Sequence, residues 1–228
     1  MLFACWSSKG GAGVSVVAAA LAARRAVDEP TLLVDLGGDQ PPLLGLAHPS
    51  PLGLTDWLWG DPDTPADGLA RLEVEVQPNW RLLPLGRSVG RVPGPQVLAR
   101  RHVLGDLLLG ERRAVVVDCG PPLAGRGGND PVVALAGDLA AGAGHSLLVI
   151  RPCYLSLRRA SQAPLRPSGL IVVEEAGRAL RSRDAGDVLG VGVVATVPVD
   201  PAVARCVDAG LFVQRTPRIV ERALRHVA

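Results

Sequence analysis

A short glycine-rich loop holds the residues best suited to bind an anion. It runs from Ser7 to Ser15 and follows an apolar segment at residues 2–6. A strand that enters a glycine loop at the start of a helix aims backbone N–H groups and the positive end of the helix dipole at one point, as phosphate oxygens require. We therefore expect a phosphate-binding cradle, and the alternative is a glycine-rich turn without a ligand. The expected cradle residues are Ser8, Lys9, Gly10, Gly11, Ala12, Gly13, Val14 and Ser15.

The cation in this loop is unusual for the chain. Of the 24 basic residues, Lys9 is the only lysine, and every other one is arginine. A compact ammonium group can enter a phosphate cradle, whereas a planar guanidinium cannot replace it there. The sole lysine therefore supports the phosphate-binding interpretation.

Two side chains with oxygen atoms are placed to hold a cation beside a bound phosphate. Ser15 brings a hydroxyl group to the start of the helix. Asp118 ends the apolar run 114–118, and an aspartate at the end of such a strand can hold Mg²⁺ through water. The alternative for Asp118 is a turn aspartate at the end of a buried strand.

These residues need a scaffold that brings several strand ends together. The expected strands, rich in β-branched residues, are 2–6, 31–35, 80–83, 114–118, 146–150, 169–173 and 191–197. The expected helices between them are 15–27, 96–109, 131–141, 155–161, 176–183, 201–209 and 216–227. This alternation predicts an α/β fold, in which a mostly parallel sheet carries helices on both faces and binds ligands at the carboxyl ends of its strands.

Length and composition predict one domain, residues 1–228, in the cytoplasm. The chain is 48% hydrophobic and 3% aromatic, which predicts a large aliphatic core. Its most apolar run, residues 14–23, is far shorter than the roughly 20 residues that cross a bilayer. The four cysteines lack CxxC spacing, which favours reduced thiols over a zinc site or a disulfide framework. A net charge of +2 leaves nucleic-acid binding to a local patch.

The loop resembles that of the deviant Walker family, which includes ParA, MinD and the pilus-positioning CpaE/TadZ proteins. The family loop reads KGGxGK followed by Thr or Ser, and Lys9 matches its signature lysine. In the family this lysine reaches across a dimer to the partner's nucleotide, while a second lysine holds the phosphates in cis. Val14 stands at the position of that second lysine. The resemblance implies a P-loop NTPase fold, a homodimer and binding of ATP or ADP with Mg²⁺.

The strand that ends at Asp35 is similar to the family's second strand and its Asp-x-Asp switch. Asp35 matches the first aspartate, and Gly37 stands where the second, water-positioning aspartate belongs. Asp39 is the expected substitute, two residues further on. The resemblance thus implies a catalytic set of Lys9, Asp35 and Asp39 and a metal-binding set of Ser15, Asp35 and Asp118. The alternative for Asp35 is a capping aspartate in a turn.

Further segments extend the resemblance over nearly the whole chain. They are residues 53–58, 82–86, 115–122 and 197–200. In the family the last of these loops lies near the adenine, which implies that Pro198 and Asp200 contact the nucleotide.

The resemblance implies a positioning or scaffolding protein that hydrolyses ATP slowly or not at all. The CpaE/TadZ branch is the nearest, which implies a protein partner in a pilus or secretion system. One alternative is a DNA-partitioning ATPase of the ParA type that uses an arginine in place of the missing lysine. Another is an interaction module that keeps the fold without binding a nucleotide.

Arginines gather at helical spacing near the end of the sequence. Arg218, Arg222 and Arg225 alternate there with apolar residues that include Val220 and Leu224. We expect the apolar side of this helix to pack on the core and the basic side to face solvent. Non-specific DNA binding, as in ParA, is the alternative. Membrane association is not expected, because the sequence ends without the amphipathic segment that MinD uses.

Overall fold

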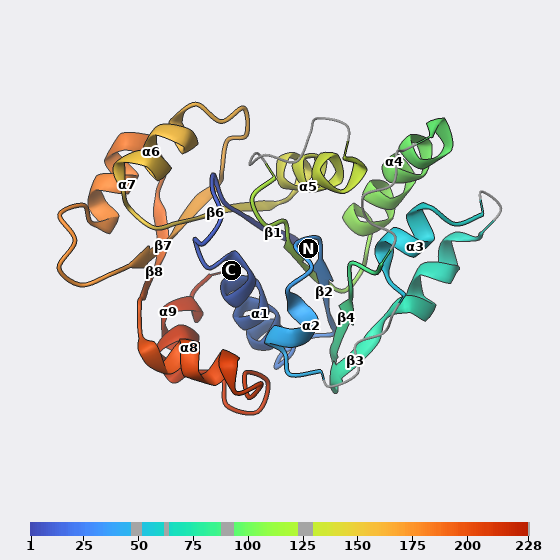
Figure 1. Ribbon diagram of the computed structural model, residues 1–228, viewed down its shortest axis with the longest axis horizontal. Helices are drawn as coiled ribbons and strands as arrows, with labels where there is room; N and C mark the ends of the chain where they lie inside the picture. Colours follow the sequence, from blue (N-terminus) through green and yellow to red (C-terminus); the bar gives the residue numbers. More distant parts are fainter. Residues whose placement is uncertain (47–51, 62–63, 88–93, 123–129, 228) are drawn as a thin grey trace.

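A single mostly parallel sheet forms the centre of the computed structural model, which describes residues 1–46, 52–61, 64–87, 94–122 and 130–227 (Figure 1). The strand order within these residues is β3-β4-β2-β5-β1-β6-β7-β8, and every neighbouring pair is parallel except β3 with β4. The strands are β1 (Leu2–Trp6), β2 (Thr31–Asp35), β3 (Val74–Gln77), β4 (Trp80–Leu83), β5 (Ala114–Asp118), β6 (His145–Ile150), β7 (Gly169–Glu174) and β8 (Val193–Pro198). The predicted fold class is confirmed.

Helices cover both faces of the sheet (Figure 1). One face packs against α3 (Leu54–Leu58), α4 (Pro95–Leu109), α5 (Pro131–Gly142), α6 (Tyr154–Ser161) and α7 (Ser182–Leu189), with a 3₁₀ helix, η1 (Ala66–Leu72), beside them. The other face packs against α1 (Val14–Arg25), α2 (Gln40–Leu43), α8 (Pro201–Asp208) and α9 (Arg218–Leu224). Because both faces are covered, the central strands β1, β2 and β5 are buried along their whole length and consist mostly of apolar residues.

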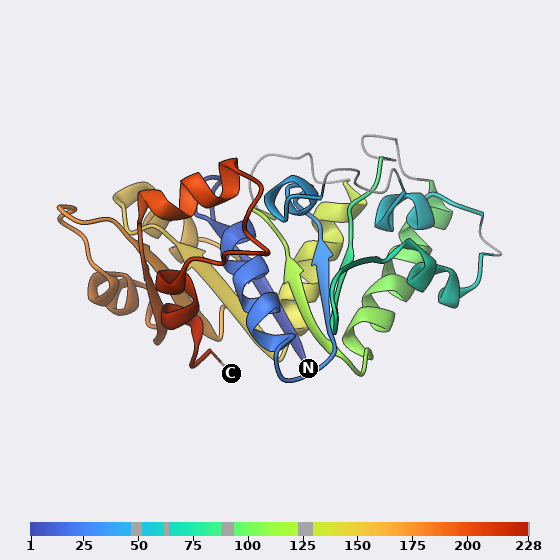
Figure 2. The ribbon, with the colours of Figure 1, turned by 90° about the horizontal axis from the view of Figure 1, so that it is seen from below.

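The carboxyl ends of the parallel strands meet at one edge of the sheet. Figure 2 shows α2 above the end of β2 and the start of α1 beside it. The glycine loop, Asp35 and Asp118 follow β1, β2 and β5, which are neighbours in the sheet. The fold therefore brings the predicted functional residues to the same edge.

The chain differs from the predicted elements in several places, and the short helices α2, α3 and η1 were not predicted. The predicted helix at 176–183 is wrong, because residues 176–177 form a turn in which Gly177 has a φ of 82°. Helix α7 begins only at Ser182, where the Asp184 carboxylate accepts a hydrogen bond from the Arg181 N–H at 2.7 Å and fixes the start of the helix. Strand β3, which was not predicted, is a four-residue edge strand in a hairpin with β4.

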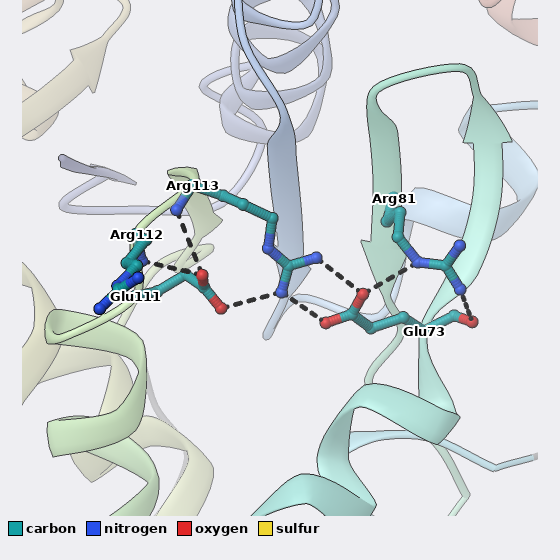
Figure 3. Close-up of polar contacts among 5 residues, drawn as sticks. All are labelled: Glu73, Arg81, Glu111, Arg112 and Arg113. Atoms are coloured by element: carbon teal, nitrogen blue, oxygen red, sulfur yellow. Dashed lines mark hydrogen bonds and ion pairs between the residues drawn. The ribbon is translucent and has the colours of Figure 1, made fainter.

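An ion network joins this hairpin to the amino end of β5 (Figure 3). The Glu73 carboxylate, only 5% exposed, accepts hydrogen bonds from Arg81 Nε at 2.9 Å and from Arg113 Nη1 and Nη2 at 2.9 and 2.8 Å. Arg113 also pairs with Glu111 at 2.9 Å. The bonds with Glu73, and then those with Glu111, raise the pKa of the Arg113 guanidinium, so the network stays charged. It lies at the opposite end of the strands from the glycine loop.

In the part of the chain that the structure covers, no helix is long and apolar enough to cross a membrane.

Candidate functional site

The loop between β1 and α1 is held in one shape by glycines and by short polar contacts. Gly11 and Gly13 have φ values of 76° and 93°, a region that favours glycine, and Gly13 lies at the N-terminal cap of α1. The Ser7 N–H donates to the Gly120 carbonyl at 3.0 Å, and the Ser8 hydroxyl donates to the Ser156 carbonyl at 3.1 Å. These contacts fasten the loop to the segment that follows β5 and to α6.

Lys9 and Val14 lie in different environments within this loop. Val14 is only 6% exposed and packs with the aliphatic residues of α1 on the sheet. Lys9 is half-buried near the start of α6. The hydrogen bond with Ser156, and then the nearby charge of Lys9, lower the pKa of the Cys153 thiol. The only cation in the loop is therefore Lys9, and the side chain at position 14 belongs to the core.

Asp35 and Asp118 form a buried pair of carboxyl groups. They are directly opposite each other in the β2–β5 register, and both are 0% exposed. Burial, and then the charge of Asp118, raise the pKa of Asp35 to about 7. Burial also raises the pKa of Asp118, while hydrogen bonds from Gln40, Ser15 and Gly120 oppose that rise. The structure thus brings three of the residues expected at a metal site, Ser15, Asp35 and Asp118, into one cluster.

Gln40 is a member of this cluster that the sequence analysis missed. Its side chain is completely buried, and Nε2 donates to Asp118 Oδ2 at 2.7 Å and to the Ser15 carbonyl at 3.0 Å. Its backbone N–H donates to Asp35 Oδ2 at 3.1 Å. A glutamine at the start of a four-residue helix has no sequence signature, because only the turn at residues 36–39 determines where its side chain lies. Gln40 thus links α1, β2 and β5.

The residues around the expected switch lie on the turn between β2 and α2. A Cβ atom at Gly37 would lie 3.5 Å from Asp118 Oδ2, so this position directly faces the buried pair. Asp39, the expected substitute, is exposed at the N-terminal cap of α2 and makes no side-chain capping bond there. The turn therefore keeps Asp39 on the surface and gives the inner position to Gln40.

A mainly apolar cavity of about 320 Å³ adjoins the loop. Gly13, Val16 and Val17 line it from the start of α1, and Pro198 and Asp200 line it from the end of β8. Asp200 Oδ1 also accepts a hydrogen bond from the Ala202 N–H at 2.7 Å and caps α8. The structure thus places two residues expected near the base, Pro198 and Asp200, beside the phosphate loop.

Several solved structures share the fold of this chain. No protein-family model and no curated protein matches the sequence significantly. Among solved structures, the septum site-determining protein MinD from Pyrococcus horikoshii, complexed with Mg-ADP, is 22% identical over 97% of this chain and 91% of its own, with a TM-score of 0.69. A ParA family ATPase from Chlorobium tepidum is 19% identical over 98% and 96% of the two chains, with a TM-score of 0.72.

A third solved structure has the same fold. A chain of the MinC:MinD cell division protein complex from Aquifex aeolicus is 19% identical over 98% of this chain and 94% of its own, with a TM-score of 0.70. The fold of this chain is therefore that of the MinD and ParA ATPases. In this chain, Val14 at the start of α1 is buried, and the Gln40 amide contacts Asp118.

Proposed function

We propose that this chain is a nucleotide-binding positioning or scaffolding protein of the ParA/MinD type, which binds ATP or ADP and hydrolyses ATP slowly or not at all. The observation that carries this proposal is the glycine loop, which caps α1 directly beside an apolar cavity. Backbone N–H groups at a helix N-terminus suit phosphate, and an apolar cavity suits a flat base. The Mg-ADP in the Pyrococcus horikoshii MinD structure supports a nucleotide as the ligand.

Slow hydrolysis follows from charge that the site lacks. Val14 offers no positive charge to a phosphoryl group in transfer, and Gly37 offers no carboxylate to orient a water molecule. Asp39 is the remaining candidate for that second role, and its exposed position at the start of α2 makes it a poor one. We therefore expect a protein that uses nucleotide binding, more than turnover, as its signal.

The same proposal includes a homodimer and a protein partner in the cytoplasm. Lys9 is the loop cation that a second subunit can use, because it is only half-buried. The MinC:MinD complex supports a partner protein for this chain. The degenerate loop favours the CpaE/TadZ branch, and hence a role in placing pilus or secretion machinery.

Calorimetric titration with ATP and ADP, together with a turnover assay, tests this function against its rivals. The proposal predicts binding at micromolar concentrations and turnover no greater than that of a mock preparation. Turnover that DNA stimulates would favour the DNA-partitioning ATPase instead. Failure of both nucleotides to bind would leave the interaction module as the better account.

A further inference from the structure

The Gln40 side chain holds an unusual position for a neutral residue. Its amide nitrogen, fully buried, contacts both Asp118 Oδ2 and the Ser15 carbonyl, while its oxygen, Oε1, has no hydrogen-bond partner within the described part of the chain. A buried acceptor left unpaired costs about 1–3 kcal/mol. The contact of the nitrogen with Asp118 must offset that cost, which indicates that Asp118 needs a donor at this point.

The oxygens of the two buried carboxyl groups already have donors from the chain itself. Asp35 accepts from the N–H groups of Gly38 at 2.7 Å and Gln40 at 3.1 Å, one on each oxygen. Asp118 accepts from the Gly120 N–H at 3.1 Å on one oxygen and from Gln40 Nε2 at 2.7 Å on the other. The Ser15 side chain is also hydrogen-bonded to Asp118.

This donor set does not fit Mg²⁺. A magnesium ion at such a site needs carboxylate or hydroxyl oxygens that are free to accept from its bound water or to coordinate it. Here the positive ends of N–H dipoles lie against those oxygens, and they would repel a divalent cation placed beside them. Each carboxyl oxygen of Asp35 and Asp118 therefore already has an N–H donor from the protein, and the Gln40 amide occupies the space beside Asp118 Oδ2.

We propose that the Gln40 amide takes the place of the divalent cation at this site, so that the protein binds its nucleotide without Mg²⁺. The inference rests on the proposed function for the nucleotide itself. The amide supplies partial positive charge to Asp118, and the phosphates are left to the loop N–H groups and to Lys9. A nucleotide-bound state of this kind does not depend on the metal that a hydrolysing site requires.

The wild-type protein provides the first test. In titration calorimetry, we expect the affinity for ATP in EDTA to stay within about twofold of the affinity in excess MgCl₂. In thermal unfolding without nucleotide, MgCl₂ should leave the melting temperature unchanged. A loss of affinity of about tenfold or more in EDTA, or a clear rise in melting temperature with MgCl₂ alone, would overturn the inference.

The second test is the variant Gln40→Glu, which replaces the N–H donor by a third carboxylate. We expect MgCl₂ alone to raise its melting temperature by several degrees, roughly the response to a ligand that binds only the folded state. Gln162→Glu, which makes the same charge change at the exposed end of α6, should not respond. Equal responses from the two variants would contradict the role of Gln40. If Gln40→Glu does not fold, the two wild-type measurements decide whether the Gln40 amide takes the place of the cation.

The two proposals can fail separately. If the wild-type protein binds no nucleotide, the proposed function fails, and the melting experiments with MgCl₂ alone still decide whether Gln40 replaces the cation. If the nucleotide binds only with Mg²⁺, the proposed function stands and the inference about Gln40 fails.

Discussion

Val14 and Gly37 are two uncharged residues at the edge of the proposed nucleotide site. Val14 is buried in the aliphatic layer under α1, so its side chain contributes to folding more than to ligand binding. Gly37 lies against Asp118, and an aspartate there would bring a third carboxyl group to the buried pair. Because a donor amide rather than a metal faces that pair, glycine is the less costly residue at position 37.

Asp35 should make stability depend on pH. Its pKa of about 7 in the folded protein is far above the value of about 3.9 expected in the unfolded chain, because burial and then Asp118, with a smaller effect from Asp39, disfavour its charge. A raised pKa means that the folded state holds the proton of Asp35 more tightly than the unfolded chain does. The stability that this proton contributes is fully present below about pH 4 and is lost as pH rises through about 7.

We therefore expect the free energy of unfolding to fall from about pH 5 to about pH 7, by at most about 1.4 kcal/mol per pH unit from this group. Urea unfolding at several pH values measures this change in the free energy of unfolding. The variant Asp35→Asn should lose most of this dependence while keeping that of the other carboxyl groups. Parallel pH curves for the two proteins would show that Asp35 is not the group responsible.

Lys9 should matter for dimerisation and nucleotide binding together. If a second subunit supplies this lysine to the phosphates, Lys9→Ala weakens nucleotide binding and nucleotide-dependent dimerisation together. The reason is that the binding equilibrium and the dimerisation equilibrium are linked. Thermal stability should change little, because Lys9 is only half-buried in a loop. Lys9→Arg should weaken nucleotide binding and dimerisation nearly as much as Lys9→Ala does. Analytical ultracentrifugation with and without ATP checks this, and identical mass distributions for all three proteins would exclude the role in trans.

Among the secondary-structure elements, the hairpin β3–β4 depends on Glu73. This side chain is 5% exposed and neutralises Arg81 and Arg113 across two strands (Figure 3). Changing Glu73→Gln leaves both guanidinium groups without their shared carboxylate and should cost about 2–3 kcal/mol in the free energy of unfolding. The matched control is Glu75→Gln, because Glu75 is 68% exposed and lies 3.8 Å from Arg81. Similar midpoints for the two variants in denaturant unfolding would contradict a stabilising role for the network.

The sequence predicts the buried strands and the long helices well, because β1, β2 and β5 are continuous apolar runs and α1 follows a glycine loop. It predicts the cluster of Ser15, Asp35 and Asp118 because parallel strand ends must meet at one edge. It does not predict Gln40, whose position depends on the turn after β2. It also places a helix at 176–183, where Gly177 in a left-handed turn interrupts the pattern.

For the molecule as a whole, the arrangement of α1 and α9 creates a basic groove on one side of the sheet. Arg24, Arg218, Arg222 and Arg225 line it together with Asp28 and Glu221, and Arg24 is paired with Asp28 at 2.6 Å. As expected, Val220 and Leu224 of α9 are buried, and Arg218, Arg222 and Arg225 are exposed. The acidic residues weaken the groove as a site for polyanions.

DNA binding by this groove should therefore be weak, without sequence preference and steeply dependent on salt. Changing Arg218, Arg222 and Arg225 together to Glu should abolish DNA retention measured by gel shift at low salt. A matched triple change of Arg158, Arg159 and Arg183 to Glu, on the other face of the sheet, should have less effect. If neither triple change alters DNA retention, the basic groove does not bind DNA and is simply a solvated helix surface.

Titration calorimetry of ADP binding, with wild-type protein and a variant whose cavity is filled, shows whether the cavity beside the glycine loop takes the nucleotide base. Val203 lines the cavity beside the loop, and Val203→Trp would fill space that the base requires. Val188→Trp is the control, because Val188 is 57% exposed on α7 across the sheet. We expect wild type and the control to bind ADP with the same affinity, and Val203→Trp to lower the affinity for ADP by about tenfold or more. Wild-type protein that does not bind ADP, or binding that Val203→Trp leaves unchanged, would contradict it.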